Sequence, residues 1–262
     1  VSHIIIHSAE DLEKMYGAKY AQSDAWKCFL RIKSLLQTGE TVLFVGTPCQ
    51  VAGLLSFLKK KYKNLITVDM ICHGVPSPLV WKRYLVERRY RDADGASIKS
   101  VNLRSKVSGW SKYSYSVEIE YDNHKQYCVH QDQDVFMKGF INNLYLRNSC
   151  ANCKFKGIER CSDITLGDYW GVWNKHPDMD DNMGTSLIFI HSHNGKRLWM
   201  DIKDAFEYIK INPEESIDMN RSIIESSVPH MRRTEFFNKV NSCSNIIDLI
   251  EQSIIIQDKG KE

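Results

Sequence analysis

The strongest constraint on the fold is an alternation of strand-like and helix-like runs in the first third of the chain. Residues 41–46 (TVLFVG) and 64–71 (NLITVDMI) are short apolar runs rich in β-branched side chains, which favours buried strands. Between them, Pro48 begins a run with apolar residues at helical spacing, for which Thr47 is the predicted N-cap. A second helical run begins at Pro78. This order predicts two adjacent parallel strands joined by a right-handed crossover.

The middle of the chain changes to a period of two, which is typical of antiparallel strands. Residues 101–107 and 113–121 alternate in this way, and a turn at 122–124 leads into 126–130. The predicted fold class is therefore α/β with α+β character: a mixed sheet with a parallel β-α-β core, an antiparallel hairpin section and flanking helices. Further helices are predicted over 24–36, 132–147 and 196–210, and further strands over 1–7, 163–172 and 186–191.

Composition argues against several classes of function. The formal net charge is +3 at pH 7, and the basic runs at 59–61 and 88–89 resemble solvated helix faces, so no nucleic-acid partner is expected. No apolar run reaches the ~20 residues of a membrane-spanning helix, and no signal peptide is recognisable. We therefore expect a cytoplasmic protein. Because Val1 opens what reads as a strand already under way, we also expect the chain to be part of a longer polypeptide.

Four of the eight cysteines are predicted to converge. Cys49 and Cys72 each follow the carboxyl end of a predicted parallel strand, and those ends form one edge of the sheet. Cys49 also lies in the first turn of a helix, where the helix dipole favours the thiolate that binds metal. Cys150 and Cys153 form a CxxC pair, a spacing that lets two sulfurs hold one metal or one cluster. Together they supply the four thiolates of a cubane iron–sulfur cluster.

Other interpretations of the cysteines remain open at this stage. Cys161 could replace one of the four ligands, and the CxxC pair could be half of a zinc site. Cys72 could be a nucleophile with His73 as its base, although adjacent turn residues seldom face each other. Buried packing roles are expected for three isolated cysteines, Cys28, Cys128 and Cys243.

The chain resembles the coenzyme F-420 hydrogenase/dehydrogenase beta-subunit family. The resemblance extends over about residues 17–210 and is carried by four motifs in the family's order. These are GTPCQVAGL at 46–54, CHGVPSP at 72–78, CANCKFK at 150–156 and SDITLGDYWG at 162–171.

The resemblance implies cofactors and partners. Family members hold a 4Fe-4S cluster and bind FAD, and the hydrogenase members pass electrons to the deazaflavin coenzyme F-420; bacterial relatives often accompany polysaccharide-synthesis genes. Many also carry an N-terminal ferredoxin-like segment that is not seen in this sequence, so a ferredoxin-like domain or another redox protein is the expected partner. The expected organisation is an iron–sulfur and flavin oxidoreductase domain over residues 1–212 and a peripheral helical tail over 213–262.

A flavin-binding segment is also implied. Residues 17–23 resemble the family's GSKYxxS segment, with Ala18 in place of Ser. Lys19 and the helix N-terminus at Thr47 suit a flavin diphosphate, and the Tyr20 ring could stack on the cofactor. An ordinary loop with a surface lysine is the alternative.

Three functions follow from these observations. The leading hypothesis is an iron–sulfur flavoprotein that relays electrons to a flavin or deazaflavin. The second is a metal-stabilised interaction module without catalysis. The third is a transferase in polysaccharide synthesis that uses Cys72. No catalytic residue is assigned. Lys112 and Tyr113 form an unassigned aromatic and cationic group. Asp163 and Asp168 flank a predicted strand at i and i+5, on opposite faces, and are poor candidates for an acid–base pair.

Overall fold

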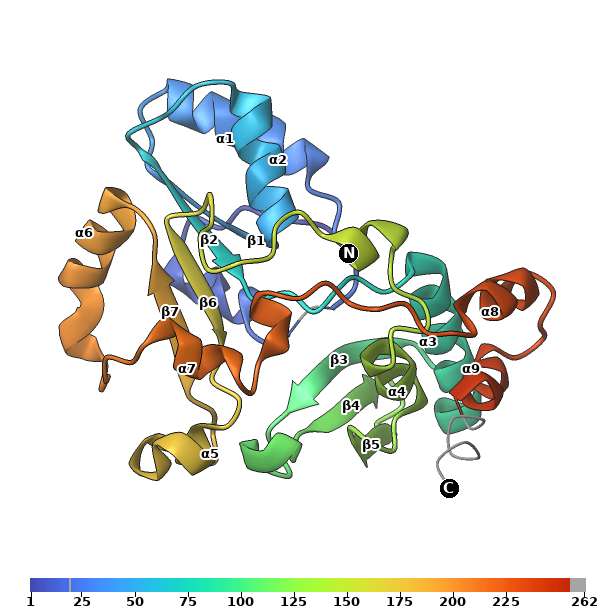
Figure 1. The fold of residues 1–262 in the computed structure, drawn as a ribbon. Helices are drawn as coiled ribbons and strands as arrows, with labels where there is room; N and C mark the ends of the chain where they lie inside the picture. The colour runs from blue at the N-terminus through green and yellow to red at the C-terminus, as the bar shows by residue number, and fades with distance from the viewer. Residues whose placement is uncertain (19, 255–262) are drawn as a thin grey trace.

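The described residues form two β-sheets that lie side by side (Figure 1). The computed structural model describes residues 1–18 and 20–254. The first sheet has the order β1-β2-β6-β7, with β7 antiparallel to its neighbour and the other strands parallel, and the second sheet, β3-β4-β5, is antiparallel. The strands are β1 (Val42–Gly46), β2 (Leu65–Met70), β3 (Ile98–Ser105), β4 (Ser116–Tyr121), β5 (Gln126–His130), β6 (Ile164–Asp168) and β7 (Ser186–Ile190).

The first sheet and its helices, here called the parallel half, contain the predicted β-α-β unit. Strands β1 and β2 pair in parallel, with Gly46 opposite Asp69, and α2 (Pro48–Leu58) connects them. The Gln50 side chain accepts a hydrogen bond from the Thr47 backbone N–H at 3.0 Å, which confirms Thr47 as the N-cap. Helices α1 (Trp26–Gln37) and α2 share an apolar core with both strands, and α6 (His193–Ile202) contacts the start of β6.

The second sheet packs against helices to form the antiparallel half (Figure 1). These helices are α3 (Pro78–Ala93), α4 (Val135–Ile141), α8 (Arg233–Val240) and α9 (Ile246–Ile254). Their shared core is the largest in the described part of the chain and is rich in aromatic side chains. The predicted antiparallel section and its hairpin turn are therefore confirmed.

Several predicted elements differ from the structure. The helix expected over 196–210 is α6, which ends at Ile202, and the strand expected over 163–172 is β6, which ends at Asp168. The helix expected over 132–147 is reduced to α4, which begins after the Asp134 N-cap and ends before Asn143, whose φ of 59° is left-handed. The chain then extends so that Leu146 can bridge to Pro76. The strand expected over 1–7 is only one bridge, between Ser2 and Asp24.

The tail is not peripheral, contrary to the sequence-based expectation. Phe236, Ile246 and Ile250 are almost fully buried in the core of the antiparallel half. None of the helices over residues 1–18 and 20–254 is both long and apolar enough to span a bilayer. The remaining short elements are α5 (Val172–Lys175), α7 (Pro213–Ile217) and the 3-10 helices η1 (Ala9–Met15), η2 (Ser111–Tyr113), η3 (Asn148–Asn152), η4 (Pro177–Met179), η5 (Lys203–Ala205) and η6 (Arg221–Ile223).

Candidate functional site

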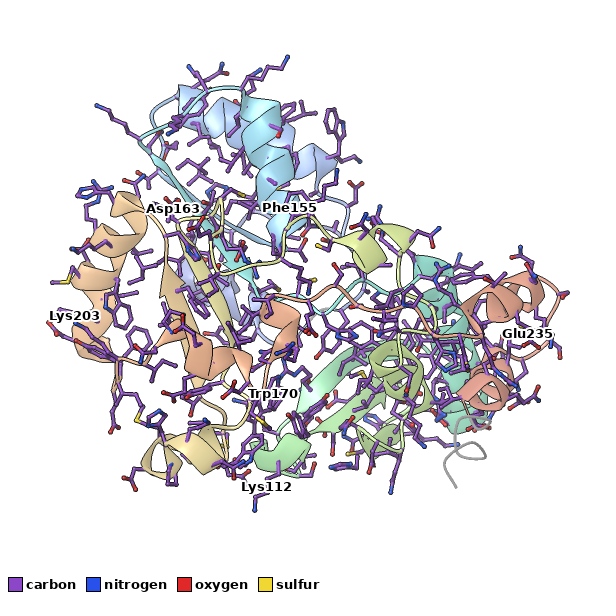
Figure 2. The ribbon with its side chains drawn as sticks, viewed as in Figure 1. Lys112, Phe155, Asp163, Trp170, Lys203 and Glu235 are labelled. Carbon is purple, nitrogen blue, oxygen red and sulfur yellow. The ribbon has the colours of Figure 1, made fainter. Side chains whose placement is uncertain are left out.

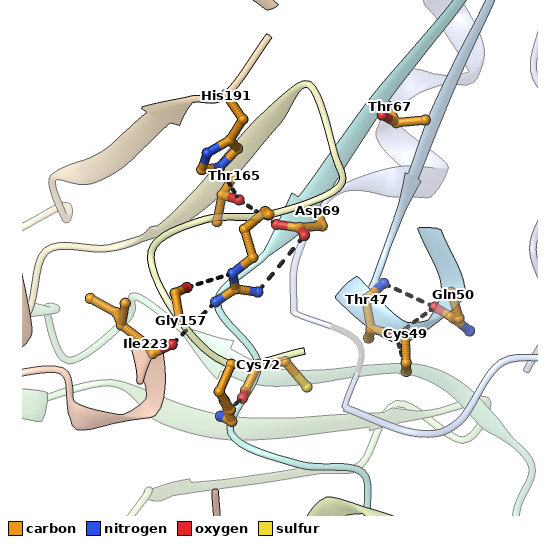
Figure 3. Close-up of polar contacts among 12 residues, drawn as sticks. Thr47, Cys49, Gln50, Thr67, Asp69, Cys72, Gly157, Thr165, His191 and Ile223 are labelled. Atoms are coloured by element: carbon orange, nitrogen blue, oxygen red, sulfur yellow. Dashed lines mark hydrogen bonds and ion pairs between the residues drawn. The ribbon is translucent and has the colours of Figure 1, made fainter. Parts of the chain in front are cut away.

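Cys49 and Cys72 follow neighbouring parallel strands, at the same edge of the sheet. Cys49 is the second residue of α2, and its sulfur lies 3.2 Å from the Thr47 hydroxyl. Cys72 lies just beyond β2, which ends at Met70. Figure 3 shows both cysteines where β1 and β2 end. This juxtaposition follows directly from the parallel pairing of the two strands.

The CxxC pair approaches the same edge from another part of the chain. Cys150 lies within η3, and Cys153 is its C-cap. Burial raises the pKa of the Cys72 thiol to about 12; the Lys156 ammonium lowers it, and Cys49, Cys150 and Cys153 each raise it further. The other three cysteines are therefore near enough to act on the charge of Cys72. All eight cysteines are free of disulfides.

The arrangement does not fit a single metal ion. Among the described residues, no group of three or more His, Cys, Asp or Glu side chains is placed to hold one. A mononuclear zinc site draws its sulfurs to about 2.3 Å from one ion. A cubane cluster binds each thiolate through a different iron and spreads them farther apart. The four cysteines are reduced and lie beside the partly buried Lys156 ammonium, and thiolates are the donors that an iron–sulfur cluster takes.

The cation Lys156 was not identified by sequence analysis. Its ammonium donates to the Cys72 carbonyl at 2.5 Å and to the Ser222 carbonyl at 2.7 Å. Burial lowers the Lys156 pKa, and interactions with Cys72, Cys153 and Cys150 raise it. Within the described ranges it has no carboxylate partner. Its position just after the CxxC pair was the available sequence signal.

Cys161, the alternative ligand, and His73, the alternative base, each have other neighbours. The thiol of Cys161 lies beside Asp69 and Arg160, whose charges act on its pKa after the main effect of burial. The His73 ring packs edge-on against Phe140, 5.1 Å between centroids, and burial lowers its pKa. The His73 ring is therefore in contact with Phe140, and no hydrogen bond between this ring and the Cys72 thiol is present among the described residues.

Asp69 belongs to a buried polar network beside this edge (Figure 3). Its carboxylate accepts a hydrogen bond from Thr165 at 2.5 Å and lies 3.8 Å from the Arg160 guanidinium. The Thr165 hydroxyl also contacts the His191 ring at 2.8 Å. Burial raises the Asp69 pKa. The network joins the middle strands of the sheet to the loop that follows the CxxC pair.

The isolated cysteines agree only in part with the packing prediction. Cys28 is buried in the core shared by α1 and α2. Cys243 is partly buried, and its thiol donates to the Val240 carbonyl at 3.3 Å. Cys128 is exposed on β5, so its predicted burial is wrong, because it occupies the solvent side of an edge strand.

The three predicted flavin-binding residues differ in their surroundings. Lys19 lies outside the described residues. Tyr20 packs its ring on Phe140, 4.7 Å between centroids, and its hydroxyl lies beside Arg104. Thr47 uses its hydroxyl within the α2 N-terminus, where it contacts Gln50 and Cys49. One face of the Tyr20 ring is therefore already occupied by protein.

A cavity of about 440 Å³ lies beside the CxxC pair. Gln22, from the predicted flavin-binding segment, lines it, together with Ser149, which precedes Cys150. Arg147 and Arg233 contribute cations, and Phe237 contributes an apolar wall. The Arg233 guanidinium stacks 4.6 Å from the Phe237 ring. A ligand with an apolar ring and an anionic group fits this lining.

The two sheets meet at an aromatic cluster whose members the sequence analysis treated as separate motifs. Arg104, on β3, forms an ion pair with Asp168, on β6, at 2.9 Å. Its guanidinium lies 4.1 Å from the centre of a Trp110 ring, and Trp110 stacks on Trp170 at 5.3 Å. Figure 2 labels Trp170 and nearby Lys112 in this region. Asp163 binds Thr67 instead, so the two aspartates act apart, as expected.

A family model matches more than half of the chain. It describes the C terminus of the beta subunit in the coenzyme F420 hydrogenase/dehydrogenase family, and it covers residues 39–216. The match includes all four candidate cluster cysteines, whereas residues 17–23 and helices α8 and α9 lie outside it. No curated protein matches the chain.

Proposed function

Because this chain belongs to the coenzyme F420 hydrogenase/dehydrogenase beta-subunit family, we propose that it is an iron–sulfur flavoprotein module of an oxidoreductase. In this proposal Cys49, Cys72, Cys150 and Cys153 hold a 4Fe-4S cluster. The module relays electrons between the cluster and a flavin or deazaflavin. The observation that carries the proposal is that Cys49, from one segment, and the CxxC pair, from another, both lie near enough to Cys72 to act on its charge.

The chain's own residues create the environment that such a cluster needs. When bound, the cluster supplies one-electron transfer. The N-terminus of α2 places the positive end of a helix dipole beside Cys49. Cys72 is partly buried. Lys156 offers a fixed positive charge to the thiolates.

The cavity lined by Gln22, Arg147 and Arg233 is our candidate site for the flavin, FAD or a deazaflavin. The Arg147 guanidinium can bind a phosphate with two parallel hydrogen bonds. Arg233 donates to the Leu146 carbonyl and stacks on Phe237, so it adds positive charge, and the other face of the Phe237 ring is the surface for a planar ring. Ser149 lines the cavity and precedes Cys150, so a bound flavin would lie near the cluster. Lys19 remains a candidate for the diphosphate.

The name of the family describes a beta subunit, which implies a component of a larger enzyme. We propose that a ferredoxin-like domain or another redox protein exchanges electrons with the cluster. The nearly balanced charge supports neither a nucleic-acid partner nor a basic membrane-binding surface. The proposed location is the cytoplasm, where cysteines remain reduced.

Anaerobic purification and reconstitution with iron and sulfide test this proposal. The protein should be brown, with a broad absorption near ~400 nm, as expected for thiolate-bound iron–sulfur clusters. Cys49→Ser and Cys150→Ser should lose most of the iron and the ability to reduce a flavin or viologen. Cys128→Ser and Cys243→Ser are matched controls and should keep both. Circular dichroism of each variant separates ligand loss from unfolding, because cluster binding and folding are coupled.

The opposite pattern would identify other ligands. Retention of full iron by the Cys49 and Cys150 variants would overturn the ligand set. A colourless protein with stoichiometric zinc would favour a metal-stabilised interaction module. Rapid alkylation of Cys72 in a metal-free protein would favour the transferase.

A further inference from the structure

A segment beyond the family match fastens both cysteine-bearing loops. This segment, residues 222–227, is called the strap. The Ser226 hydroxyl accepts a hydrogen bond from the Cys153 backbone N–H at 2.9 Å. The Ile223 carbonyl accepts one from Gly157 at 2.9 Å, and the Ser227 hydroxyl donates to the His73 carbonyl. The strap therefore spans the turn after β2 and the loop after the CxxC pair.

Lys156 is the charged centre of this assembly. Its ammonium lies between the carbonyls of Cys72 and Ser222, so one side chain joins the two cysteine-bearing loops and the strap. Two carbonyl acceptors hold the cation without neutralising it, as a carboxylate would. Its charge acts on Cys72, Cys153 and Cys150. A neighbouring lysine, Lys154, is exposed and makes no hydrogen bond or ion pair with the other described residues.

We propose that Lys156, held in place by the strap, is the charge-compensating residue of the cluster and a determinant of its reduction potential. This inference rests on the proposed function. Four thiolates make a cubane cluster net negative in both oxidation states. Reduction adds one electron from a one-electron donor and no proton, so the negative charge increases by one. A fixed cation stabilises the reduced state more than the oxidised state.

The strap adds a mechanical contribution that can be separated from the charge. Loss of the Lys156 charge should destabilise the reduced cluster and loosen both loops. Loss of the Ser226 hydroxyl should loosen the loop at Cys153 but leave the charge in place. The reduction potential reports the loss of the charge. The rate at which a chelator removes iron reports both the loss of the charge and the loosening of the loops.

The experiment compares variants of the full chain loaded anaerobically with iron and sulfide. Lys156→Met is expected to lower the midpoint potential of the cluster. A redox titration monitored by visible and electron paramagnetic resonance spectra measures this potential. This variant should also lose iron to a chelator about tenfold faster, since one charge-assisted hydrogen bond contributes about 1.5 kcal/mol. Lys156→Arg should restore the potential. Ser226→Ala should lose iron faster at an unchanged potential, and Lys154→Met should change neither.

A loaded Lys156→Met protein with the parent potential would overturn the inference while leaving the proposed function intact. If Lys156→Met holds no cluster, Lys156→Gln and Lys156→Arg decide the question. Cluster retention by arginine alone supports a charge requirement, and loss in all three variants overturns it. A parent protein that takes up no cluster would overturn the proposed function, and this inference with it.

Discussion

The two halves of the molecule differ in what their interiors contain. The antiparallel half buries a continuous core of aromatic and aliphatic side chains, completed by α8 and α9. The parallel half divides its apolar residues between smaller clusters, and it buries Asp69 and Thr165 where the antiparallel half buries Asp134. The candidate cysteines lie between these environments: Cys150 packs against the antiparallel core, whereas Cys49 and Cys72 follow parallel strands. Stability and chemistry are therefore concentrated in different parts of the fold.

The largest expected effect tests the apolar core of the antiparallel half. Phe236 is 1% exposed and lies 5.7 Å from Tyr145 between ring centroids. Phe236→Ala should lower the free energy of unfolding by about 4 kcal/mol, since it removes a buried ring and leaves a cavity. Urea denaturation measures the change. The control is Phe206→Ala, in the parallel half, where the ring is 53% exposed and a small effect is expected. Similar losses in the two variants would contradict the comparison.

The next effect compares two carboxylates that each accept one backbone and two hydroxyl hydrogen bonds. Asp134 is fully buried and accepts from Tyr84, Tyr127 and Met137. Asp163, in the parallel half, is only partly buried and accepts twice from Thr67 and once from Ser192.

Replacement by asparagine should cost about 3 kcal/mol at Asp134 and about 1 kcal/mol at Asp163, because water can replace lost partners only at the second site. Chemical denaturation of the two variants provides the measurement. Equal losses of unfolding free energy in the two variants would show that burial of the carboxylate does not set the cost of its replacement.

The third effect concerns the contact between the two sheets at Arg104. Arg104→Met removes the ion pair with Asp168 and the contact with Trp110, and should cost about 2 kcal/mol. Arg104→Lys keeps the charge but lacks the planar group, so an intermediate loss is expected in thermal unfolding. A lysine variant as stable as the parent would show that charge alone joins the halves. The iron content of both variants should be unchanged.

The smallest effect is a pH dependence in the parallel half. Hydrogen bonds from Tyr169 and His176 hold the Glu215 pKa below its usual value. This stabilisation is present above the unfolded pKa of about 4.3 and is lost as the pH falls through the lower folded value. Glu215→Gln should therefore flatten the acid side of the stability profile between about pH 5 and 3.

Thermal unfolding across this pH range provides the test. Glu235→Gln, on α8, is the control: Glu235 forms an exposed ion pair with Lys239 one turn away, so it should change the profile less. A larger change at Glu235 would assign the acid sensitivity to the antiparallel half.

Much of the candidate site could be predicted because its elements are local. The apolar periods of two and 3.6 separate strands from helices, and Thr47-Pro48 marks the start of α2. Parallel strands end at one edge, so the positions of Cys49 and Cys72 followed from chain order. The prediction that the tail is peripheral was wrong. Ile246, Ile247 and Ile250 have helical spacing and are buried, but the many polar residues of the tail hide this short apolar face in the sequence.

Backbone periodicity and chain connectivity are enough to predict the strand and helix order, the parallel pair β1-β2 and the shared edge of two cysteines. Two contacts could be found only in the folded chain: Lys156 held between Cys72 and Ser222, and Arg104 paired with Asp168. Each of those contacts joins residues more than sixty positions apart, and none is required by local backbone preferences. They form because packing the two halves together removes much of the water around these polar groups, which then bond to each other.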